Sequence, residues 1–202
     1  MAIKLTRRRI AALLAGLAAG AGLGKSAAAQ DSGGDMPAAS TGIEPIMPSP
    51  PPPFHFTDQA GKALTLGDFK GQGLVVNFWA TWCGPCVAEL PTLAALSPKL
   101  SPDDIRVLAI SVDMTGPAVV LPFFAAHHID GLTPLFDESS SALDAFGTSG
   151  IPLTVILDRQ GRVVAKLEGG ADWNNPSTAS MIRQLVGKPE VNMPAAPQVK
   201  AI

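Results

Sequence analysis

Two cysteines and their neighbours have the types and spacing of a dithiol redox site. Cys83 and Cys86 enclose Gly84-Pro85, and they are the two cysteines of the 202-residue chain. The i, i+3 spacing lets the two thiols close a disulfide. Exchange chemistry of this kind needs a thiolate as the attacking species. The spacing therefore predicts a pair that alternates between dithiol and disulfide.

The elements on either side of the pair are expected to supply that thiolate. Residues 74–79 are apolar, β-branched or aromatic and predict a buried strand, whereas the segment from Pro85 has helical composition with proline in a favoured first-turn position. The cysteines then lie at a helix N-terminus, where unpaired N–H groups and the positive dipole end stabilise a thiolate. We predict that Cys83 attacks a substrate disulfide and that Cys86 resolves the mixed disulfide, without a cofactor.

Two other roles for the pair stay open. The cysteines could form an inert disulfide, or they could be half of a zinc site. The remaining zinc ligands would be His55, His127 and His128, and none of them has finger-like spacing. We interpret His127 and His128 as surface residues at the end of a helix, where cations suit the dipole.

The sequence FWATWCGPC, residues 78–86, resembles the active site of the thioredoxin family. The VAELP that follows resembles the TlpA-like (ResA-like) branch, which consists of exported thiol-disulfide oxidoreductases. Residues 54–187 fit this branch in length and in the order of elements. The resemblance implies a thioredoxin fold of the α/β class, a central mixed β-sheet flanked by α-helices. It also implies an N-terminal hairpin and a TlpA-like β-α insertion.

The remaining elements of this domain position the pair. A β-α-β order predicts parallel pairing of residues 74–79 with a second strand over residues 106–112. Asn175 can cap the last helix, with Pro176 at its first position and Gly187 past its end. The other predicted elements are a hairpin within 54–66, a helix over 117–129 that Pro122 should kink, a strand over 132–136, a helix over 140–146, and a terminal hairpin of strands over 153–157 and 162–168.

Three further residues, Trp82, Ile151 and Pro152, are expected to contact the substrate. In thioredoxin-like proteins a cis-proline lies against the dithiol, and Ile151-Pro152 resembles it. A proline that starts a strand has no N–H to donate, and a cis bond turns the preceding backbone groups outward, where an extended substrate can pair with them. A plain turn proline is the alternative. Trp79 and Trp82 are expected to shield the dithiol and to form contact surface.

Glu89 is the candidate for proton transfer. It lies three residues beyond Cys86 on the same helical face, so its carboxylate could take or give the Cys86 proton. A glutamate here also resembles the TlpA-like pattern, and a solvated helix charge is the alternative. Thioredoxin has a buried aspartate at the position of Asn77, so Glu89 or water must serve here instead. We interpret Trp173 as a packing residue.

The two ends of the chain differ from the domain in composition. Residues 1–29 combine a basic segment, an apolar run and an Ala-Ala-Ala site, and predict a signal peptide of either the general secretory or the twin-arginine type; an uncleaved anchor is the alternative. Residues 30–53 predict a Pro-rich disordered linker, with a ligand for a recognition domain as the alternative. Residues 188–202 predict a disordered tail. The domain is therefore expected in the periplasm.

Composition and resemblance together narrow the function. The net charge of −2 shows no basic excess for nucleic acid. We predict a periplasmic monomer that reduces specific protein disulfides and that a membrane thiol carrier recharges. The resemblance implies that the substrates are the cysteines of apocytochrome c or of copper-site assembly proteins. An oxidative disulfide-forming enzyme is an alternative, although Gly84-Pro85 resembles the reducing thioredoxins. A copper-binding module that uses Cys83, Cys86 and a histidine is another, and a peroxidase is a weaker one.

Overall fold

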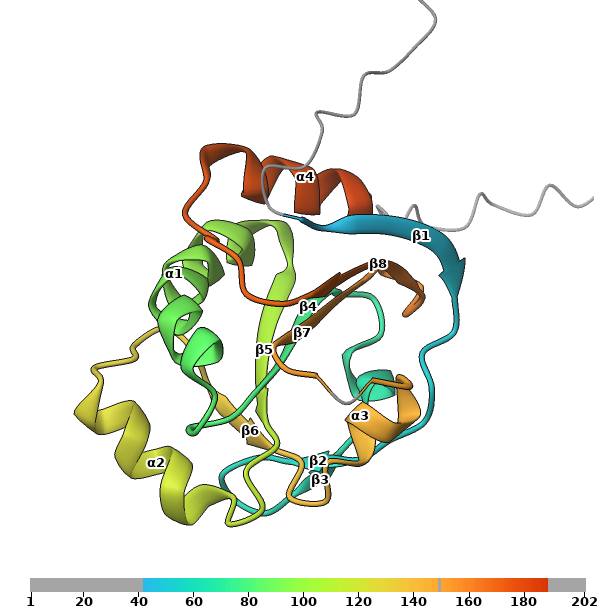
Figure 1. The fold of residues 1–202 in the computed structure, drawn as a ribbon. Coiled ribbons are helices and arrows are strands. Elements are labelled where there is room, and N and C mark those ends of the chain that lie inside the picture. Colours follow the sequence, from blue (N-terminus) through green and yellow to red (C-terminus); the bar gives the residue numbers. More distant parts are fainter. Residues whose placement is uncertain (1–41, 149, 189–202) are drawn as a thin grey trace, which may run out of the picture. The chain divides into compact units, whose positions relative to one another are not determined.

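The computed structural model describes residues 42–148 and 150–188, and Figure 1 shows its fold. The strands are β1 (Glu44–Ser49), β2 (Phe56–Thr57), β3 (Ala63–Leu64), β4 (Gly73–Trp79), β5 (Ile105–Ser111), β6 (Pro134–Phe136), β7 (Leu153–Leu157) and β8 (Val163–Glu168). The helices are α1 (Gly84–Leu100), α2 (Pro117–Ala126), α3 (Ser141–Ala145) and α4 (Pro176–Val186), with short 3-10 turns η1 (Leu66–Phe69) and η2 (Ser101–Asp103). Across the described ranges the strands form one eight-stranded sheet in the order β1-β8-β7-β4-β5-β6-β2-β3.

Strand β4 lies inside the sheet and leads directly to the cysteines. All of its residues are buried, and it pairs in parallel with β5 and antiparallel with β7. Because successive side chains of a strand point to opposite faces, Val75 packs with residues of α1, α2 and α4, whereas Val76 packs with the β2 region and α3. The sheet is therefore mixed and covered by helices on both faces, and the predicted thioredoxin fold is confirmed.

The predicted elements recur with small shifts in their ends. Helix α1 is the crossover between parallel strands β4 and β5, as the β-α-β order predicts. Asn175 caps α4, since its Oδ1 accepts a hydrogen bond of 3.0 Å from the Ser177 N–H. Helix α2 ends at Ala126 and not at residue 129, because His128 adopts a φ of 50° and the Ile129 N–H bonds back to the Phe124 carbonyl.

The predicted disordered linker over residues 30–53 is wrong for the part that the structure describes. Residues Glu44–Ser49 form β1, which pairs antiparallel with β8. Strand β1 is at the edge of the sheet, where a proline needs no ladder partner, so Pro45 and Pro48 are compatible with it. Ile43, which is 2% exposed, joins the core just before the strand. The predicted signal peptide, the first part of the linker and residues 189–202 lie outside the described residues.

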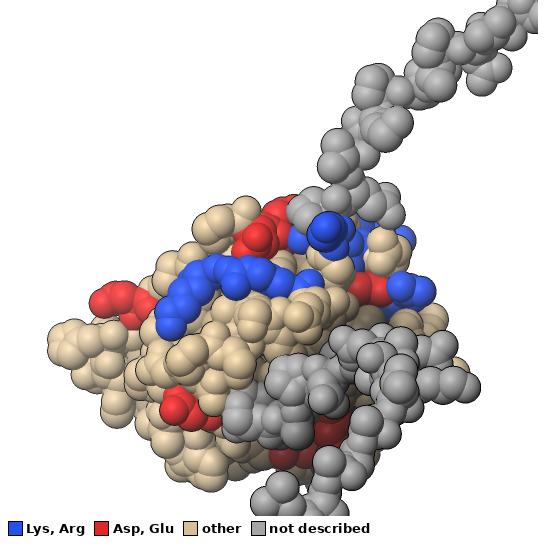
Figure 2. Space-filling view, turned by 90° about the horizontal axis from the view of Figure 1, so that it is seen from above, with Lys and Arg blue, Asp and Glu red and all other residues tan. Residues whose placement is uncertain are grey.

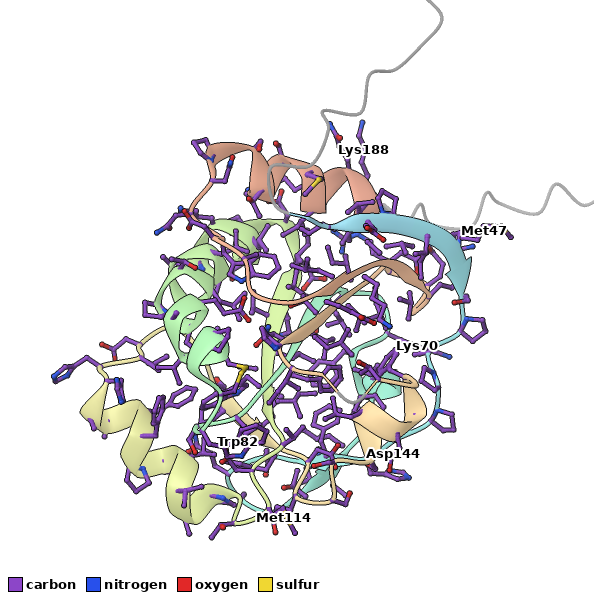
Figure 3. The ribbon with its side chains drawn as sticks, viewed as in Figure 1. Met47, Lys70, Trp82, Met114, Asp144 and Lys188 are labelled. Carbon is purple, nitrogen blue, oxygen red and sulfur yellow. A yellow bond between two sulfur atoms is a disulfide. The ribbon has the colours of Figure 1, made fainter. Side chains whose placement is uncertain are left out.

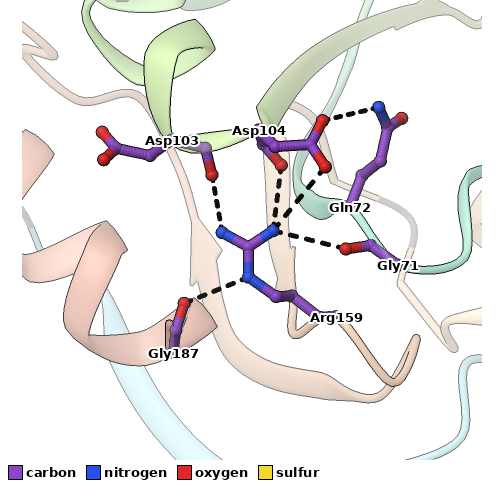
Figure 4. A network of polar contacts seen from close by, with 6 residues as sticks. All are labelled: Gly71, Gln72, Asp103, Asp104, Arg159 and Gly187. Carbon is purple, nitrogen blue, oxygen red and sulfur yellow. Dashed lines mark hydrogen bonds and ion pairs between the residues drawn. The ribbon is translucent and has the colours of Figure 1, made fainter. Parts of the chain in front are cut away.

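Arg159 ties together the end of the sheet that lies away from the cysteines (Figure 4). Its side chain is buried, and its guanidinium donates hydrogen bonds to the carbonyl oxygens of Gly71, Asp103, Asp104 and Gly187. These carbonyls belong to the turn before β4, the turn before β5 and the end of α4. A charge that is removed from water needs this full set of partners. Arg159 is therefore a structural residue, and it holds the starts of the two central strands in register.

Acidic and basic side chains are mixed on the face that carries β1 and α4. Figure 2 shows Lys and Arg side chains next to Asp and Glu side chains there. Among the ion pairs of the described residues, Lys166 pairs with Glu168, and Arg183 pairs with Asp103. Within residues 42–148 and 150–188, none of the helices has the length and apolar character needed to cross a membrane.

Candidate redox site

Cys83 and Cys86 form a disulfide at the N-terminus of α1. Their Cα atoms are 5.3 Å apart. Cys83 is the N-cap residue, with extended backbone angles, and Cys86 lies inside the first turn of the helix. Pro85 occupies a first-turn position, where its missing N–H costs no helical hydrogen bond. The motif thus places one sulfur at the helix end and the other one turn inside it.

The Cys83 sulfur lies against a backbone donor of the helix. The Cys86 N–H donates to Cys83 Sγ over 3.3 Å. In the dithiol form this donor and the helix dipole both favour a negative charge on Cys83. Cys83 is 6% exposed and Cys86 is 0% exposed. Cys83 is therefore the more accessible of the two cysteines, although it is itself buried.

The Ile151–Pro152 peptide bond is cis, and it lies beside the disulfide. Cys83 Sγ is 3.7 Å from the Ile151 carbonyl oxygen, which can accept a hydrogen bond from the thiol in the reduced form. Ile151 is half-buried, whereas Pro152 is buried at the start of β7. The expected cis-proline is thus confirmed in its geometry, next to the sulfur predicted to react first.

Glu89 lies on α1 three residues after Cys86 and is buried, with only 3% of the residue exposed. Its Oε2 accepts hydrogen bonds from the Ala171 N–H (2.9 Å) and the Trp173 Nε1–H (3.2 Å), and its Oε1 accepts one from Asn77 Nδ2 (2.8 Å). Removal from water raises the pKa of Glu89 above its ordinary value, while the bonds from Ala171, Asn77 and Trp173 act in the opposite direction. The alternative of a solvated helix charge is therefore wrong.

The roles of Trp173 and Asn77 were not foreseen from the sequence. Trp173 packs in the core as expected, but its indole N–H also binds Glu89. Asn77 Nδ2 bridges Glu89 and Thr154, and Asn77 Oδ1 is buried without a partner among the described residues. The alternation of side chains along β4 could have indicated that Asn77 faces α1, because residues 75, 77 and 79 share the face of β4 that α1 covers.

A surface groove of about 490 Å³ lies beside Glu89. It is lined by Pro85, Ala88, Glu89, Thr92, Gly170, Ala171, Asp172 and Asn174. The groove thus joins the first turns of α1 to the loop between β8 and α4. Water in it can exchange protons with the otherwise buried carboxyl group.

The two tryptophans near the disulfide have different environments. Trp82 is 71% exposed, and Figure 3 shows it projecting from the loop before α1. Trp79 is 0% exposed and packs against Phe123 and Phe124 with ring centroids 5.6 Å away. Contact surface is therefore available from Trp82, and the expectation of contact surface from Trp79 is wrong because α2 covers it.

Metal-ligating side chains do not gather in the part of the chain that the structure describes. Within it, no group of three or more His, Cys, Asp or Glu side chains is placed to hold a metal ion. The His127 ring stacks on Phe123 with centroids 4.1 Å apart, at the end of α2. The sequence expectation for His127 and His128 was a surface position, and both residues are exposed.

Comparisons with known proteins agree with this geometry. The family model described as Redoxin matches residues 32–182. The chain is 32% identical over 118 residues to the thiol-disulfide oxidoreductase ResA of Bacillus thuringiensis subsp. konkukian. That alignment covers 58% of this chain and 67% of the ResA protein. It is 31% identical to ResA of Bacillus subtilis over 118 residues, 58% of this chain and 65% of that protein.

The fold also has relatives among solved structures. A thiol:disulfide interchange protein from Bacteroides sp. superposes with a TM-score of 0.58 at 21% identity, over 70% of this chain and 90% of that one. This likeness concerns the fold alone. The family match includes the strand, the helix and the two cysteines of the site, and the ResA proteins share nearly a third of the aligned residues. The chain therefore belongs to the Redoxin family, and it is a thioredoxin-like thiol-disulfide oxidoreductase.

Proposed function

We propose that the chain reduces protein disulfides in the periplasm through Cys83 and Cys86. The observation that carries the proposal is the position of Cys83 Sγ. It is 3.3 Å from the Cys86 N–H at the helix N-terminus and 3.7 Å from the carbonyl oxygen of Ile151, the residue before the cis-proline. The first contact favours a thiolate, and the second offers backbone groups beside it for an extended substrate.

The reaction proceeds in two exchange steps. The Cys83 thiolate attacks one sulfur of the substrate disulfide, that S–S bond breaks, and the other substrate sulfur leaves as a thiolate and takes up a proton. The Cys86 thiol then loses its proton, attacks Cys83 Sγ, and releases the second substrate sulfur. Two electrons pass from the dithiol to the substrate. A reductant must then return the Cys83–Cys86 disulfide to the dithiol.

Glu89 is the proposed acceptor of the Cys86 proton. It is on the same face of α1 as Cys86, and burial raises its pKa, so the group can hold a proton closer to neutral pH than an exposed carboxylate can. The groove beside it supplies water for the return of that proton to solvent. Asn77 and Trp173 hold the carboxyl group in place from β4 and from the loop before α4.

The composition of residues 1–29 supports the proposed location, and the TlpA-like resemblance supports the proposed partners. The basic, then apolar residues 1–29 support export, by cleavage of a signal peptide or with that segment kept as an anchor. The proposed substrates are the cysteines of apocytochrome c or of copper-site assembly proteins. The proposed electron donor is a membrane thiol carrier.

The redox potential of the pair tests the direction of the reaction. Equilibration with glutathione should place it at or below about −200 mV, as for thioredoxin-like reductants, and the reduced protein should reduce insulin. A potential near about −120 mV would assign the chain to disulfide formation instead. Metal analysis of the purified protein, run alongside, separates this function from that of a copper-binding module: stoichiometric copper together with no insulin reduction would contradict the proposal.

A further inference from the structure

Two of the most exposed large apolar side chains of residues 42–148 and 150–188 lie at the redox end of the sheet. Trp82 is 71% exposed and Met114 is 83% exposed. Trp82 follows the end of β4, and Met114 follows the end of β5, the strand that runs parallel to it. Figure 3 shows both at the same end of the sheet, while Met47, which is 87% exposed, lies on β1 at the sheet edge.

A buried carboxylate fixes these two loops to each other. Asp113, 4% exposed, accepts hydrogen bonds from the Thr81 N–H (2.9 Å) and the Thr81 hydroxyl (2.7 Å). It also accepts one from the Ser111 hydroxyl at 2.8 Å. Trp82 and Met114 are the residues that directly follow the two members of the Thr81–Asp113 pair. The Thr81–Asp113 hydrogen bonds therefore hold the two loops together, and Trp82 directly precedes Cys83.

We infer that Met114 is a specificity-determining residue, which together with Trp82 receives apolar side chains next to the cysteine of a protein substrate. The inference rests on the proposed function and deepens it. Cys83 is only 6% exposed, so a protein disulfide that reaches its sulfur brings the polypeptide around that disulfide into contact with this surface. Exposed apolar side chains that adjoin a reactive site mark an interaction surface.

The chemistry of the two side chains indicates the occupant. Trp82 supplies a wide flat surface, and Met114 supplies an unbranched, polarizable side chain that adapts to different apolar partners. The Asp113 pair holds their backbones in position before the substrate arrives, so less ordering is needed on binding. The fitting partner is a polypeptide with apolar residues flanking its disulfide, rather than one with a charged or strongly polar flank.

Three disulfide substrates test the inference on the reduced full-length chain. Two are synthetic peptides with the same Cys-x-x-Cys disulfide, one flanked by leucine and phenylalanine and the other by serine and glutamine. The third is hydroxyethyl disulfide, which is too small to reach Met114 while it reacts. The readout is the second-order rate constant of reduction for each. We expect the parent protein to prefer the apolar peptide to the polar one.

Met114→Gln should lower the rate constant for the apolar peptide by about fivefold, the effect of losing part of the burial of one apolar side chain, about 1 kcal/mol. The substitution should leave the rate constants for the polar peptide and for hydroxyethyl disulfide unchanged. Met114→Leu should keep the preference. Met47→Gln, the matched control on β1, should change none of the three rate constants. Because Met114 is 83% exposed, its replacement should not disturb folding.

Each contrary result points to a different failure. If the parent protein reduces all three substrates without preferring the apolar peptide, or if Met114→Gln keeps the preference, the inference is wrong and the proposed function stands. If the parent protein reduces none of the three, the proposed function fails, and the inference fails with it. If sedimentation shows a dimer that Met114→Gln dissociates, the surface binds a second copy of this chain and the inference is also wrong.

Discussion

Replacement of Glu89 by glutamine should change how the stability of the protein depends on pH. The pKa of Glu89 is raised in the native protein by burial, relative to an ordinary value of 4.5. The native state therefore keeps a proton that the unfolded state has already lost in the pH range just above 4.5. The stabilisation from this proton is complete below the unfolded pKa and disappears as the pH rises through the native pKa.

The size of the effect follows from the raised pKa and from the hydrogen bonds. Each unit by which the native pKa exceeds the unfolded one lowers the unfolding free energy by about 1.4 kcal/mol once the pH lies above both. The Glu89→Gln variant would escape this loss. The oxygen of the new amide can accept from Ala171 and Trp173, and its nitrogen can donate to the unpartnered Oδ1 of Asn77 after that side chain turns. Below pH 4.5 we therefore expect the two proteins to agree within about 1 kcal/mol.

The measurement is guanidinium unfolding of the oxidised protein, followed by tryptophan fluorescence, between about pH 4 and pH 8. The disulfide keeps both cysteines from titrating, so their ionisation does not contribute. Glu89→Gln should gain stability relative to the parent protein as the pH rises. Glu44→Gln, on the exposed edge strand β1, makes the same change in charge and should follow the parent protein. A constant difference between Glu89→Gln and the parent across this range would refute the reasoning.

Two further substitutions separate the site from the scaffold. Trp173→Phe keeps most of the packing but removes a hydrogen bond to Glu89 Oε2. It should therefore raise the pKa of Glu89 further and lower the unfolding free energy near pH 7 by about 1–3 kcal/mol. The same pH series of unfolding measurements tests this, and a stability profile equal to that of the parent protein would contradict a role of the Trp173–Glu89 hydrogen bond. Arg159→Met removes the donor to the carbonyl oxygens of Gly71, Asp103, Asp104 and Gly187. It should lower the unfolding free energy by about 3 kcal/mol or more in the same assay, while the rate of insulin reduction by the folded protein stays the same. A selective loss of that rate at unchanged stability would place Arg159 in the redox chemistry.

The sequence was most informative where local chemistry decides the structure. The apolar run before Cys83 predicted a buried strand, and Pro85 and Asn175 are typical of helix starts, so β4, α4 and the start of α1 were predicted close to their observed positions. The dithiol was predicted from the spacing of its two cysteines, which depends on neighbours within a few residues. The cis-proline was expected from the resemblance of Ile151-Pro152 to thioredoxin-like proteins, and the structure confirms the cis bond.

The features that were missed depend on contacts distant in sequence. Strand β1 is rich in proline and was interpreted as a spacer, because its pairing with β8 leaves no local pattern. The Trp173 indole donates a hydrogen bond to Glu89, which is 84 positions away in the sequence, and the Thr81 hydroxyl donates one to Asp113, which is 32 positions away. Each of these polar side chains looks like a surface or packing residue until the fold brings its partner beside it. The burial of Glu89 is likewise a property of the assembled sheet and not of α1.

Trapping of mixed disulfides tests the central claim, that Cys83 attacks and Cys86 resolves. Cys86→Ser keeps the attacking sulfur but cannot release the substrate, so mixed disulfides with partner proteins should accumulate in periplasmic extracts and be identified by mass spectrometry after non-reducing separation. Cys83→Ser should trap none, because the attacking sulfur is gone and Cys86 is fully buried. If Cys83→Ser captures partners and Cys86→Ser captures none, the assigned order of the two sulfurs is wrong.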